Sequence, residues 1–338
     1  AFALDEVTIK AYENKAGTIN SMATISARTF SAEETHRYAG GMDDPARMAS
    51  AFAGVAVGNV QDNSIIIRGN SPKGVLWTLE GVEIPNPSHF AGANVAGGGF
   101  TTLFSNHLLA NSDFFTGAFP AEYGNALAGV FDIKLRNGNN EEREYAFQAG
   151  VMGIDFAAEG PFKKGKKASY LVNYRYSTFG LIKSFIPSEQ IPEYQDISFK
   201  FNFPMKKGGE ISFWGIGGND KNSEPVTDDS TTWTYNWDRV QYDLTTNIGV
   251  VGLKYKKIIG NSAYIHSSIV ASTNNFSMDL KRMNDNLVLQ DSFDINNTTS
   301  KFTFSTFINK KFSKKHTNRT GLVLNNIYYN ARTKGRYQ

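Results

Sequence analysis

The sequence of 338 residues contains no cysteine, which excludes disulfides and thiolate metal sites. The formal net charge is only +3, too small an excess to indicate a nucleic-acid partner. No stretch approaches 18 consecutive apolar residues, so no transmembrane helix is expected. Barrel strands stay compatible with this absence, because they are short and only half apolar. The chain begins at Ala1 without a charged and apolar leader, which fits a mature chain or a fragment.

Sequence motifs of metal-binding, catalytic and phosphate-binding sites are also missing. The five histidines are scattered without the spacing of metal ligands, so no metal site is expected. No G-x-S-x-G motif or other nucleophile–base set stands out, and we expect neither catalytic residues nor a cofactor. Gly97–Gly99 lacks the lysine and hydroxyl partners of a phosphate-binding loop.

What the first part of the chain does contain is short β-branched runs separated by glycines, most clearly over residues 63–138. Such runs are typical of buried strands, and the glycines of tight turns. Strands are expected at residues 64–68, 75–79, 111–116 and 129–135, with a further candidate at 22–25. Helices are expected from Asp44-Pro45 to about Gly54 and over residues 101–109. We therefore predict a compact mixed α/β unit over residues 21–138.

From Glu141 onward, apolar and polar residues alternate with period 2, as in Ile197 to Phe203. About nine strands can be counted, and the phase changes near Gly153, which suggests a turn or a β-bulge. Short, mostly basic turns are expected at residues 163–167, 206–209, 256–262 and 313–317. Longer polar segments are expected at residues 187–195, 219–238 and 283–291. Short turns at one rim and longer loops at the other are typical of outer-membrane barrels.

A soluble β-sandwich would show similar alternation and is the alternative fold. The barrel is favoured because stretches such as residues 168–179 and 261–280 exceed ordinary strand lengths, and because 15 Tyr and 25 Phe could supply interface girdles. A barrel of eight to ten strands encloses little more than its own side chains. If residues 21–138 lie inside a barrel, we expect this chain to be an incomplete piece.

Several blocks of residues carry a family resemblance. They are Ile66-Ile67-Arg68-Gly69, Trp77-Thr78-Leu79-Glu80-Gly81-Val82, Phe115-Thr116-Gly117, Ala121-Glu122-Tyr123-Gly124 and Gly129-Val130-Phe131-Asp132-Ile133. Their order and spacing closely resemble those of the plug domain of TonB-dependent outer-membrane receptors. The sequence around Phe119-Pro120 is similar to that of receptors of the Bacteroidetes type. The resemblance implies a mixed α/β plug domain over residues 21–138, followed over residues 139–338 by the first part of an antiparallel transmembrane β-barrel of 22 strands.

The N-terminus is similar to the TonB box of this family. The matching residues are Asp5, Glu6, Val7, Thr8, Ile9, Lys10 and Ala11, within a linker over residues 1–20. Such a β-prone peptide can add a strand to the sheet edge of a partner. The resemblance implies that it binds the C-terminal domain of TonB. An ordinary first strand of the plug is the alternative.

The sequence also departs from the family. Thr116 stands where an arginine is common, and Glu80 where an aspartate is. The resemblance places the contact between plug and barrel at Arg68, Gly69, Glu122, Tyr123 and Gly124. A buried Arg68 needs a paired charge. Its partner is expected among barrel carboxylates or inside the plug, at Glu80 or Glu122.

Two groups of residues are candidates for ligand contact. In the resembled family, plug loops near residues 84–99 face the ligand, and Asn86, His89 and Phe90 lie there. Trp233, Tyr235 and Trp237 could stack on a ligand. The alternatives are packing of the first loop on the barrel wall and an interface girdle for the second group.

The resemblance implies a receptor of the bacterial outer membrane that imports a nutrient with energy from TonB and is not an enzyme. The expected partners are TonB, outer-membrane lipids and a surface lipoprotein, with no nucleic acid. A plugged barrel that serves as a subunit of a surface assembly and a soluble carbohydrate-binding protein are the alternatives.

Overall fold

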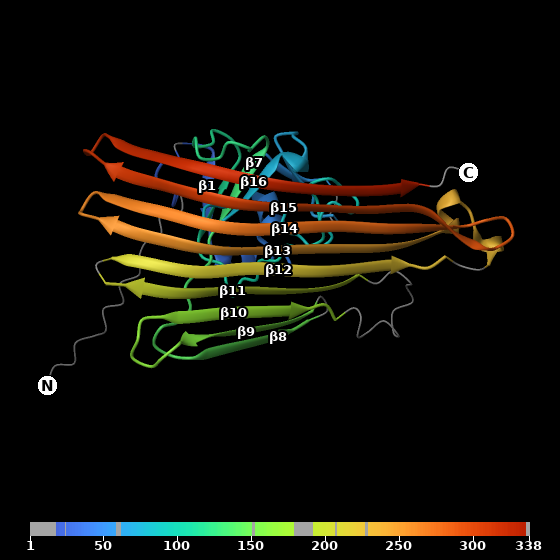
Figure 1. Cartoon of the computed structure of the whole chain (residues 1–338), viewed down its shortest axis with the longest axis horizontal. Helices are drawn as coiled ribbons and strands as arrows, with labels where there is room; N and C mark the ends of the chain where they lie inside the picture. Colours follow the sequence, from blue (N-terminus) through green and yellow to red (C-terminus); the bar gives the residue numbers. More distant parts are fainter. Residues whose placement is uncertain are drawn as a thin grey trace.

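The computed structural model describes residues 18–23, 25–58, 62–150, 153–178, 192–206, 208–226 and 229–335, apart from the side chains of Thr232 and Trp237. They form two layers: a large antiparallel sheet, and a smaller mixed unit packed against one of its faces (Figure 1). We call the unit over residues 18–138 the plug and the large sheet the wall. The expected TonB box and its strand at Val7–Ile9 lie outside the described residues.

The plug is built around a five-stranded sheet in the order β1-β6-β7-β4-β5. Its strands are β1 (Ala27–Phe30), β4 (Val75–Leu79), β5 (Val82–Ile84), β6 (Ser112–Phe115) and β7 (Gly129–Ile133). β4 and β7 pair in parallel, and a separate pair is formed by β2 (Val55–Val57) and β3 (Ile65–Ile67). The four strands expected over residues 64–135 are confirmed. The candidate at residues 22–25 is wrong: Ala23 N closes a turn onto Asn20 O, and the first strand begins at Ala27.

Helices in the plug are short. α1 (Ala32–Arg37) begins with a capping box between Ser31 and Glu34, and α2 (Pro45–Met48) is capped by Asp44, whose carboxylate accepts from Ala46 N at 2.7 Å. The expected start at Pro45 is confirmed, although the chain passes into a 3-10 helix, η1 (Ala49–Ala51), and then into β2. A second 3-10 helix is η2 (Pro72–Gly74).

The helix expected over residues 101–109 is wrong. These residues form a loop with a single turn, in which Leu108 N donates to Ser105 O at 3.0 Å, because the amides at the start of the segment bond to distant groups. Thr102 N donates to the Asp44 carboxylate at 2.7 Å, and Leu103 N donates to Pro87 O at 2.8 Å. The apolar residues of the segment are still buried, in the core of the plug.

The core of the plug continues into the wall. Trp77 stacks on Phe131 with ring centroids 4.3 Å apart, and Phe114 packs on the same ring at 4.4 Å. Leu171 and Trp214 of the wall belong to the same buried cluster. The two layers therefore share one apolar centre.

The wall has nine strands, each paired with its neighbours in sequence. They are β8 (Glu144–Ala149), β9 (Ile154–Pro161), β10 (Ser169–Tyr176), β11 (Glu193–Met205), β12 (Gly209–Glu224), β13 (Val240–Ile259), β14 (Ala263–Met283), β15 (Leu289–Lys311) and β16 (Thr317–Gly335). The sheet is open, with β8 and β16 at its edges. Among the described residues, no helix is long and apolar enough to cross a membrane.

All four expected short turns connect strands at one end of the wall (Figure 1). At the other end the connections between β10 and β11 and between β12 and β13 are long, and the second holds two 3-10 helices, η4 (Ser230–Thr232) and η5 (Asn236–Arg239). The segment expected as a loop over residues 283–291 is shorter, because β14 and β15 extend to Met283 and Leu289. Residues 179–191, between β10 and β11, lie outside the described residues.

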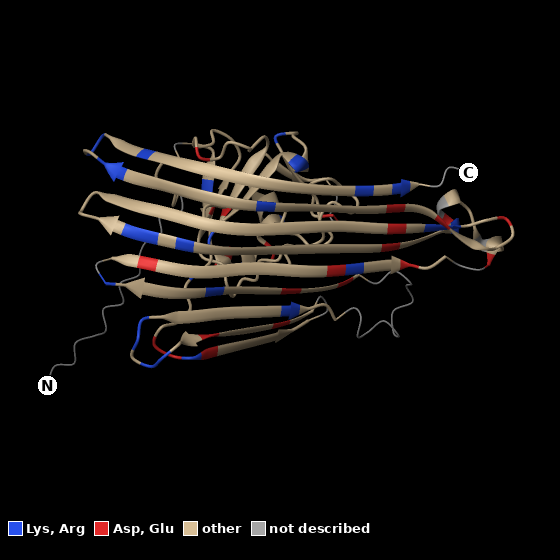
Figure 2. Cartoon of the chain, viewed as in Figure 1, with Lys and Arg blue, Asp and Glu red and all other residues tan. Residues whose placement is uncertain are grey.

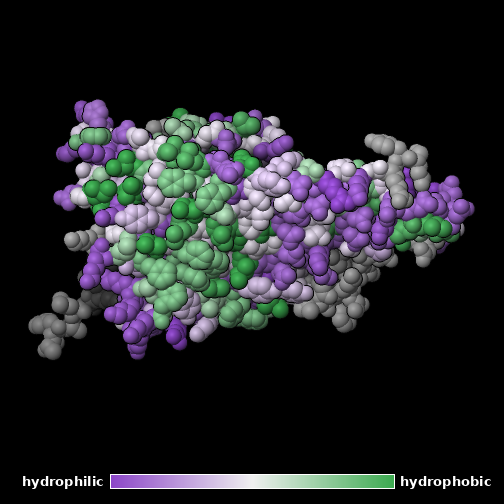
Figure 3. All heavy atoms as spheres, in the orientation of Figure 1, coloured by the Kyte–Doolittle hydropathy of each residue, from purple (hydrophilic) through white to green (hydrophobic). Residues whose placement is uncertain are grey.

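The two faces of the wall differ in chemistry. On β11, Ser198, Lys200 and Asn202 are buried against the plug, whereas Ile197 and Phe203 on the opposite face are exposed. Figure 3 shows hydrophobic residues gathered over the part of this outer face nearest the short turns, and hydrophilic residues over the other end. Period 2 therefore separates an inner face, which buries polar and charged residues around the shared apolar centre, from an outer face with an apolar band.

Candidate functional site at the contact between plug and wall

Glu80 carries a buried carboxylate from the plug to the wall. It stands with Gly81 in the two-residue turn between β4 and β5, and both residues have positive φ, 52° and 83°, as a type I′ turn requires. Its Oε1 accepts from Leu135 N at 2.8 Å and from Lys200 Nζ at 3.0 Å, and its Oε2 contacts Lys254 Nζ. One plug carboxylate thus meets lysines from β11 and β13.

The charge state of Glu80 follows from this setting. Burial alone would raise the pKa of its carboxyl group, but the charges of Lys200 and Lys254 outweigh burial and hold the pKa far below its ordinary value of 4.5. Glu80 is therefore ionised at any physiological pH, and its contact with the wall is a buried ion pair.

Two further plug carboxylates meet cations of the wall. Glu83 Oε1 lies 2.8 Å from Lys301 Nζ of β15, and Glu122 contacts the Arg319 guanidinium of β16. In these three contacts the polarity expected from the sequence is reversed, because the plug supplies the acids and the wall supplies the bases. The expected polarity is found at the end of the plug, where the Arg136 guanidinium pairs with Glu159 of β9.

His89 makes the opposite arrangement nearer the long-loop end. Its ring is fully buried, with Nδ1 2.5 Å from Asp220 Oδ1 and Nε2 2.8 Å from Asp196 Oδ2. Because a neutral imidazole has only one N–H, two carboxylate partners indicate an imidazolium. Burial lowers the pKa of His89, but the charges and hydrogen bonds of Asp220 and Asp196 outweigh burial, and the net pKa is raised. The backbone N of Phe90 adds a bond to Asp220 Oδ2 at 2.8 Å.

Arg175 of β10 extends this cluster. Its Nε donates to Asp196 Oδ2 at 2.9 Å, and another guanidinium nitrogen donates to the backbone oxygen of Thr102 in the plug at 2.7 Å. The Tyr194 ring packs 4.4 Å from the ring of His89. Charges of both signs are therefore matched inside the contact.

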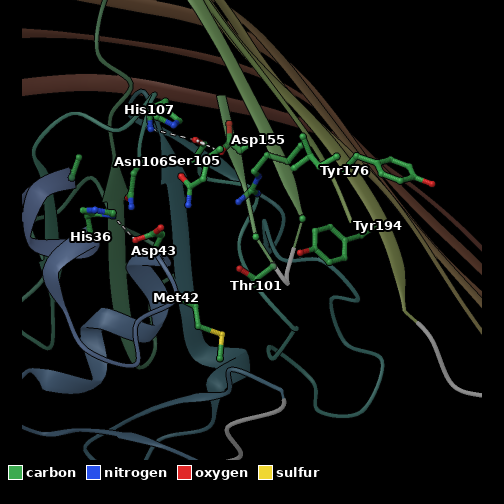
Figure 4. Close-up of a pocket in the computed structure, with 16 residues that line it drawn as sticks. His36, Met42, Asp43, Thr101, Ser105, Asn106, His107, Asp155, Tyr176 and Tyr194 are labelled. Atoms are coloured by element: carbon green, nitrogen blue, oxygen red, sulfur yellow. Dashed lines mark hydrogen bonds and ion pairs between the residues drawn. The ribbon is translucent and has the colours of Figure 1, made fainter. Parts of the chain in front are cut away.

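A cavity of about 520 Å³ lies beside this cluster, between the plug and strands β8 to β11 (Figure 4). It is lined by Ala32, His36, Met42, Asp43, Thr101, Ser105, Asn106, His107, Gln148, Gly150, Gly153, Ile154, Asp155, Arg175, Tyr176 and Tyr194. His36 Nδ1 lies 2.8 Å from Asp43 Oδ1, and Ser105 Oγ donates to Asp155 Oδ2 at 3.1 Å. Both polar atoms of the Asn106 amide are buried without a partner in the described part of the chain. The lining of the cavity therefore contains an unpaired, buried amide.

The segment that enters the plug is fixed at the short-turn end. The amides of Ile19 and Asn20 donate to the Asp113 carboxylate at 3.1 and 2.8 Å, and Asn20 Nδ2 donates to Glu122 Oε1 at 2.8 Å. Glu122 is the same residue that contacts Arg319. The start of the described chain and the wall therefore share one carboxylate.

Of the expected contact residues, only Glu122 meets the wall. Arg68 was expected to be buried, and this expectation is wrong, because its side chain is exposed. The Arg68 guanidinium donates to the hydroxyls of Ser26 and Thr116, both in the plug, at 3.3 and 3.4 Å. Gly69 and Gly124 have no other heavy atom within 4 Å of the position of a Cβ. Tyr123 is buried inside the plug, where its hydroxyl donates to Asp132 at 3.2 Å.

The expected ligand contacts are also placed differently. His89 and Phe90 are buried against the wall, because the loop packs on it, and Asn86 bonds to Gly98 O within its own loop at 2.9 Å. Trp233 packs under the Arg239 guanidinium at 4.9 Å, and Tyr235 is exposed on the same loop. Neither lines the cavity. The side chain of Trp237 lies outside the described residues.

The wall residues of the contact were not predicted. They are Arg175, Asp196, Lys200, Asp220, Lys254, Lys301 and Arg319. Their signal in the sequence is a charge at an inward position of an alternating strand, such as Lys200 between Phe199 and Phe201. Among the described residues, no group of three or more His, Asp or Glu side chains could hold a metal ion.

Comparison with known proteins yields matches in structure only. No protein-family model and no curated protein matches the sequence. The structure of the copper transporter OprC is 11% identical and has a TM-score of 0.62, over 92% of this chain and 47% of that one. FpvA of P. aeruginosa, bound to a pyoverdine, is 10% identical with a TM-score of 0.65, over 93% of this chain and 43% of that one. BauA, the ferric preacinetobactin receptor of Acinetobacter baumannii, is 11% identical with a TM-score of 0.57, over 92% of this chain and 47% of that one. The chain thus spans less than half the length of each.

These likenesses define the class of fold as a β-barrel wall with a plug on its inner face. More narrowly, it is the fold of the TonB-dependent receptors, as the sequence resemblance indicated. The soluble β-sandwich is therefore not the fold of this chain. The titles of these three structures describe a transporter and receptors, not enzymes.

Proposed function

We propose that this chain is the plug and the first part of the barrel of a TonB-dependent receptor that imports a nutrient across the bacterial outer membrane. The observation that carries the proposal is the two-faced wall. Its outer face exposes an apolar band, and its inner face buries charged side chains against the plug. A plug held in this way blocks the pore that the complete barrel encloses, until its contacts with the wall are broken. Outer-membrane lipids are the partners of the band.

The energy for breaking these contacts would enter through residues 5–11, which bind the C-terminal domain of TonB by strand addition. A pull on this segment reaches Ile19 and Asn20 first, and through them Asp113 and Glu122. The plug contacts nearest the pulled end therefore open before the contacts of His89. A surface lipoprotein is a further partner in this proposal, at the long-loop end.

The experiment is deletion of residues 5–11 in the full protein. Binding of the nutrient at the cell surface should persist, because the cavity and the wall are untouched, while uptake is abolished. Unchanged uptake would overturn the proposal in favour of a plugged barrel that serves as an assembly subunit. A matched pair of peptides over residues 1–17 adds a direct readout. Ile9→Pro removes a backbone donor from the expected strand and should abolish calorimetric binding to the TonB domain, whereas Glu13→Pro, outside the box, should not.

The cavity beside Asn106 is our proposed contact for the nutrient, because the Asn106 amide in its lining has no hydrogen-bond partner among the described residues. Asn106→Leu keeps the volume of the side chain and removes both hydrogen-bonding atoms. A panel of ferric siderophores, vitamins, peptides and glycans is titrated calorimetrically into the wild type and the variant. The true ligand should bind the variant about tenfold more weakly. Equal binding of that ligand to both proteins would remove the cavity from the site.

A further inference from the structure

Every turn at the short-turn end of the wall is rich in lysine. The connections β9–β10, β11–β12, β13–β14 and β15–β16 lie within residues 162–168, 206–208, 256–262 and 310–316. These four segments hold twelve of the 35 lysines and arginines of the chain and not one aspartate or glutamate. We call them the lysine rim. Figure 2 shows the resulting cluster of positive residues at this end of the strands.

The described lysines of the rim are available to a partner. They are Lys163, Lys164, Lys166, Lys167, Lys206, Lys256, Lys257, Lys310, Lys311, Lys314 and Lys315, all exposed. None of them lies in an ion pair with a described carboxylate, in contrast to Lys200, Lys254 and Lys301 of the inner face. Acids at this end include Glu141, Glu142 and Glu144, which lie at or just before the start of β8, and Glu210, which lies 3.8 Å from Lys254 and opposite Lys256 in the sheet. Self-repulsion among so many unpaired cations is unfavourable unless an anion offsets it.

Exposed apolar side chains accompany these lysines. Phe162 and Phe203 stack with centroids 5.4 Å apart, and Met205, Ile259 and Phe312 are exposed in or beside the other turns. The Lys310 ammonium lies 4.8 Å from the ring centroid of Phe312. A solvated charged surface would not need these apolar groups. A lipid interface needs both, because a lysine stem lies along apolar groups while its ammonium reaches the headgroups.

The opposite end of the wall has different charges. The connection over residues 225–239 contains Asp228, Asp229 and Asp238 but only one cation, Arg239, and residues 284–288 contain Asp285 and no cation. The excess of lysine therefore belongs to the turns at one end of the wall and not to connecting segments in general.

We propose that the lysine rim binds the anionic phospholipid headgroups of the membrane leaflet that meets the short turns. The apolar band sets the depth of the wall in the hydrocarbon, and the rim lysines then lie at the level of the phosphates. This inference requires the wall to span a membrane, as proposed above, but it does not depend on what the receptor carries or on TonB. Its role is to prefer anionic lipids and to fix the tilt and depth of the barrel.

The test measures lipid preference in the full protein, reconstituted in phosphatidylcholine vesicles with spin-labelled phosphatidylglycerol or spin-labelled phosphatidylcholine. Electron paramagnetic resonance gives the ratio of the two association constants. The rim variant carries Lys163→Gln, Lys164→Gln, Lys166→Gln and Lys167→Gln. The control variant removes the same charge from the far ends of β14 and β16, with Lys281→Gln, Arg282→Gln, Arg332→Gln and Lys334→Gln.

In the wild type and the control, phosphatidylglycerol should bind about threefold more tightly than phosphatidylcholine, and 1 M salt should abolish the preference. The rim variant should lose most of it. Equal binding of both lipids in the wild type, or an equal loss in both variants, overturns the inference. So does a rim variant that keeps the lipid preference and instead loses binding of an acidic polypeptide such as polyglutamate. Failure of the wild type to insert into vesicles would overturn the membrane location itself and is scored first, by flotation.

Discussion

Glu80 is surrounded by donors, with a backbone amide and two lysine ammonium groups around one carboxylate. The two lysines lie 120 and 174 residues away in sequence, and both belong to the wall. Attraction between buried opposite charges offsets the cost of taking them out of water, but removing one partner leaves that cost uncompensated.

We expect Glu80→Gln to lower the free energy of unfolding of the plug by about 3–5 kcal/mol, because Lys200 would stay buried without its counter-charge and Lys254 would keep Glu210, at 3.8 Å. Urea unfolding followed by tryptophan fluorescence measures this, with the exposed Glu141→Gln as control. Since the folded pKa of Glu80 is lowered, its contribution is complete above about pH 4.5 and is lost only as the pH falls through the much lower folded pKa. A variant as stable as the wild type at pH 7 would show that the lysines find water or other partners.

The contribution of His89 to stability depends on pH in the opposite direction. Its folded pKa is raised above 6.5, so its contribution is complete below that pH and is lost as the pH rises through the folded pKa. The groups that face it or its partners are Asp196 and Tyr194 of β11, Asp220 of β12, Arg175 of β10 and Thr246 of β13. Deprotonation would leave two buried aspartates with one fewer cation.

His89→Gln should therefore remove about 3–5 kcal/mol of plug stability at pH 6 and less at higher pH. Urea midpoints between pH 6 and pH 9 test this, and the exposed His316→Gln is the control. The wild type and the control should lose stability across this range, whereas the midpoint of His89→Gln should change little. A wild-type midpoint that rises with pH would contradict an imidazolium at this position.

At the scale of elements, β7 occupies the middle of the plug sheet, and its first residue has no room for a side chain. A Cβ on Gly129 would lie 2.3 Å from Ile67 Cδ1 and 2.8 Å from the backbone oxygen of Phe115. Gly124, in the loop before β7, has open space around the same position and no positive φ.

Gly129→Ala should destabilise the plug by about 1–3 kcal/mol, because β6 has to move away from β7. Gly124→Ala should be neutral or slightly stabilising, because alanine restricts the unfolded chain. Thermal unfolding of the two variants beside the wild type provides the measurement. Equal melting temperatures for both variants would show that the sheet adapts to the added methyl group.

The elements that the sequence predicted are those whose signal is local. Period 2 and β-branched runs located the plug strands at residues 75–79 and 129–135 and the count of wall strands. The prediction of a helix over residues 101–109 was wrong because this segment is held by contacts with distant residues, such as the hydrogen bond from Thr102 N to the Asp44 carboxylate. Apolar spacing alone does not distinguish a helix from a buried loop.

The site was less predictable, because the ion pairs of Glu80, Glu83, His89 and Glu122 join residues more than a hundred positions apart. Glu122 was placed in the contact by resemblance, but its partner Arg319 has no local signal. Arg68 was expected to be buried after three isoleucines, yet the chain turns there with positive φ and the side chain lies at the surface. The reversed polarity of Glu80 follows only from seeing which wall residues face it.

At the scale of the whole molecule, the wall buries polar and charged residues on the side toward the plug. Its outer side carries an apolar band (Figure 3). β13 crosses this band along its length. Leu253 and Asp243 lie on the same outward face of the strand, ten positions apart. Leu253 is 47% exposed and lies opposite Ile269 in the band, whereas Asp243 lies at the hydrophilic end.

Leu253→Arg should cost about 2–4 kcal/mol when the wall inserts into a bilayer, because the charge enters hydrocarbon. Asp243→Arg, on the same face but beyond the band, should cost close to nothing. Refolding into vesicles, followed by urea titration of the inserted protein, measures both. In a water-soluble protein an arginine at an exposed position is harmless, so equal stability of the two variants would contradict a membrane location. A large difference between them instead places one part of β13 in lipid and the other in water, and so gives the position of the whole wall in the membrane.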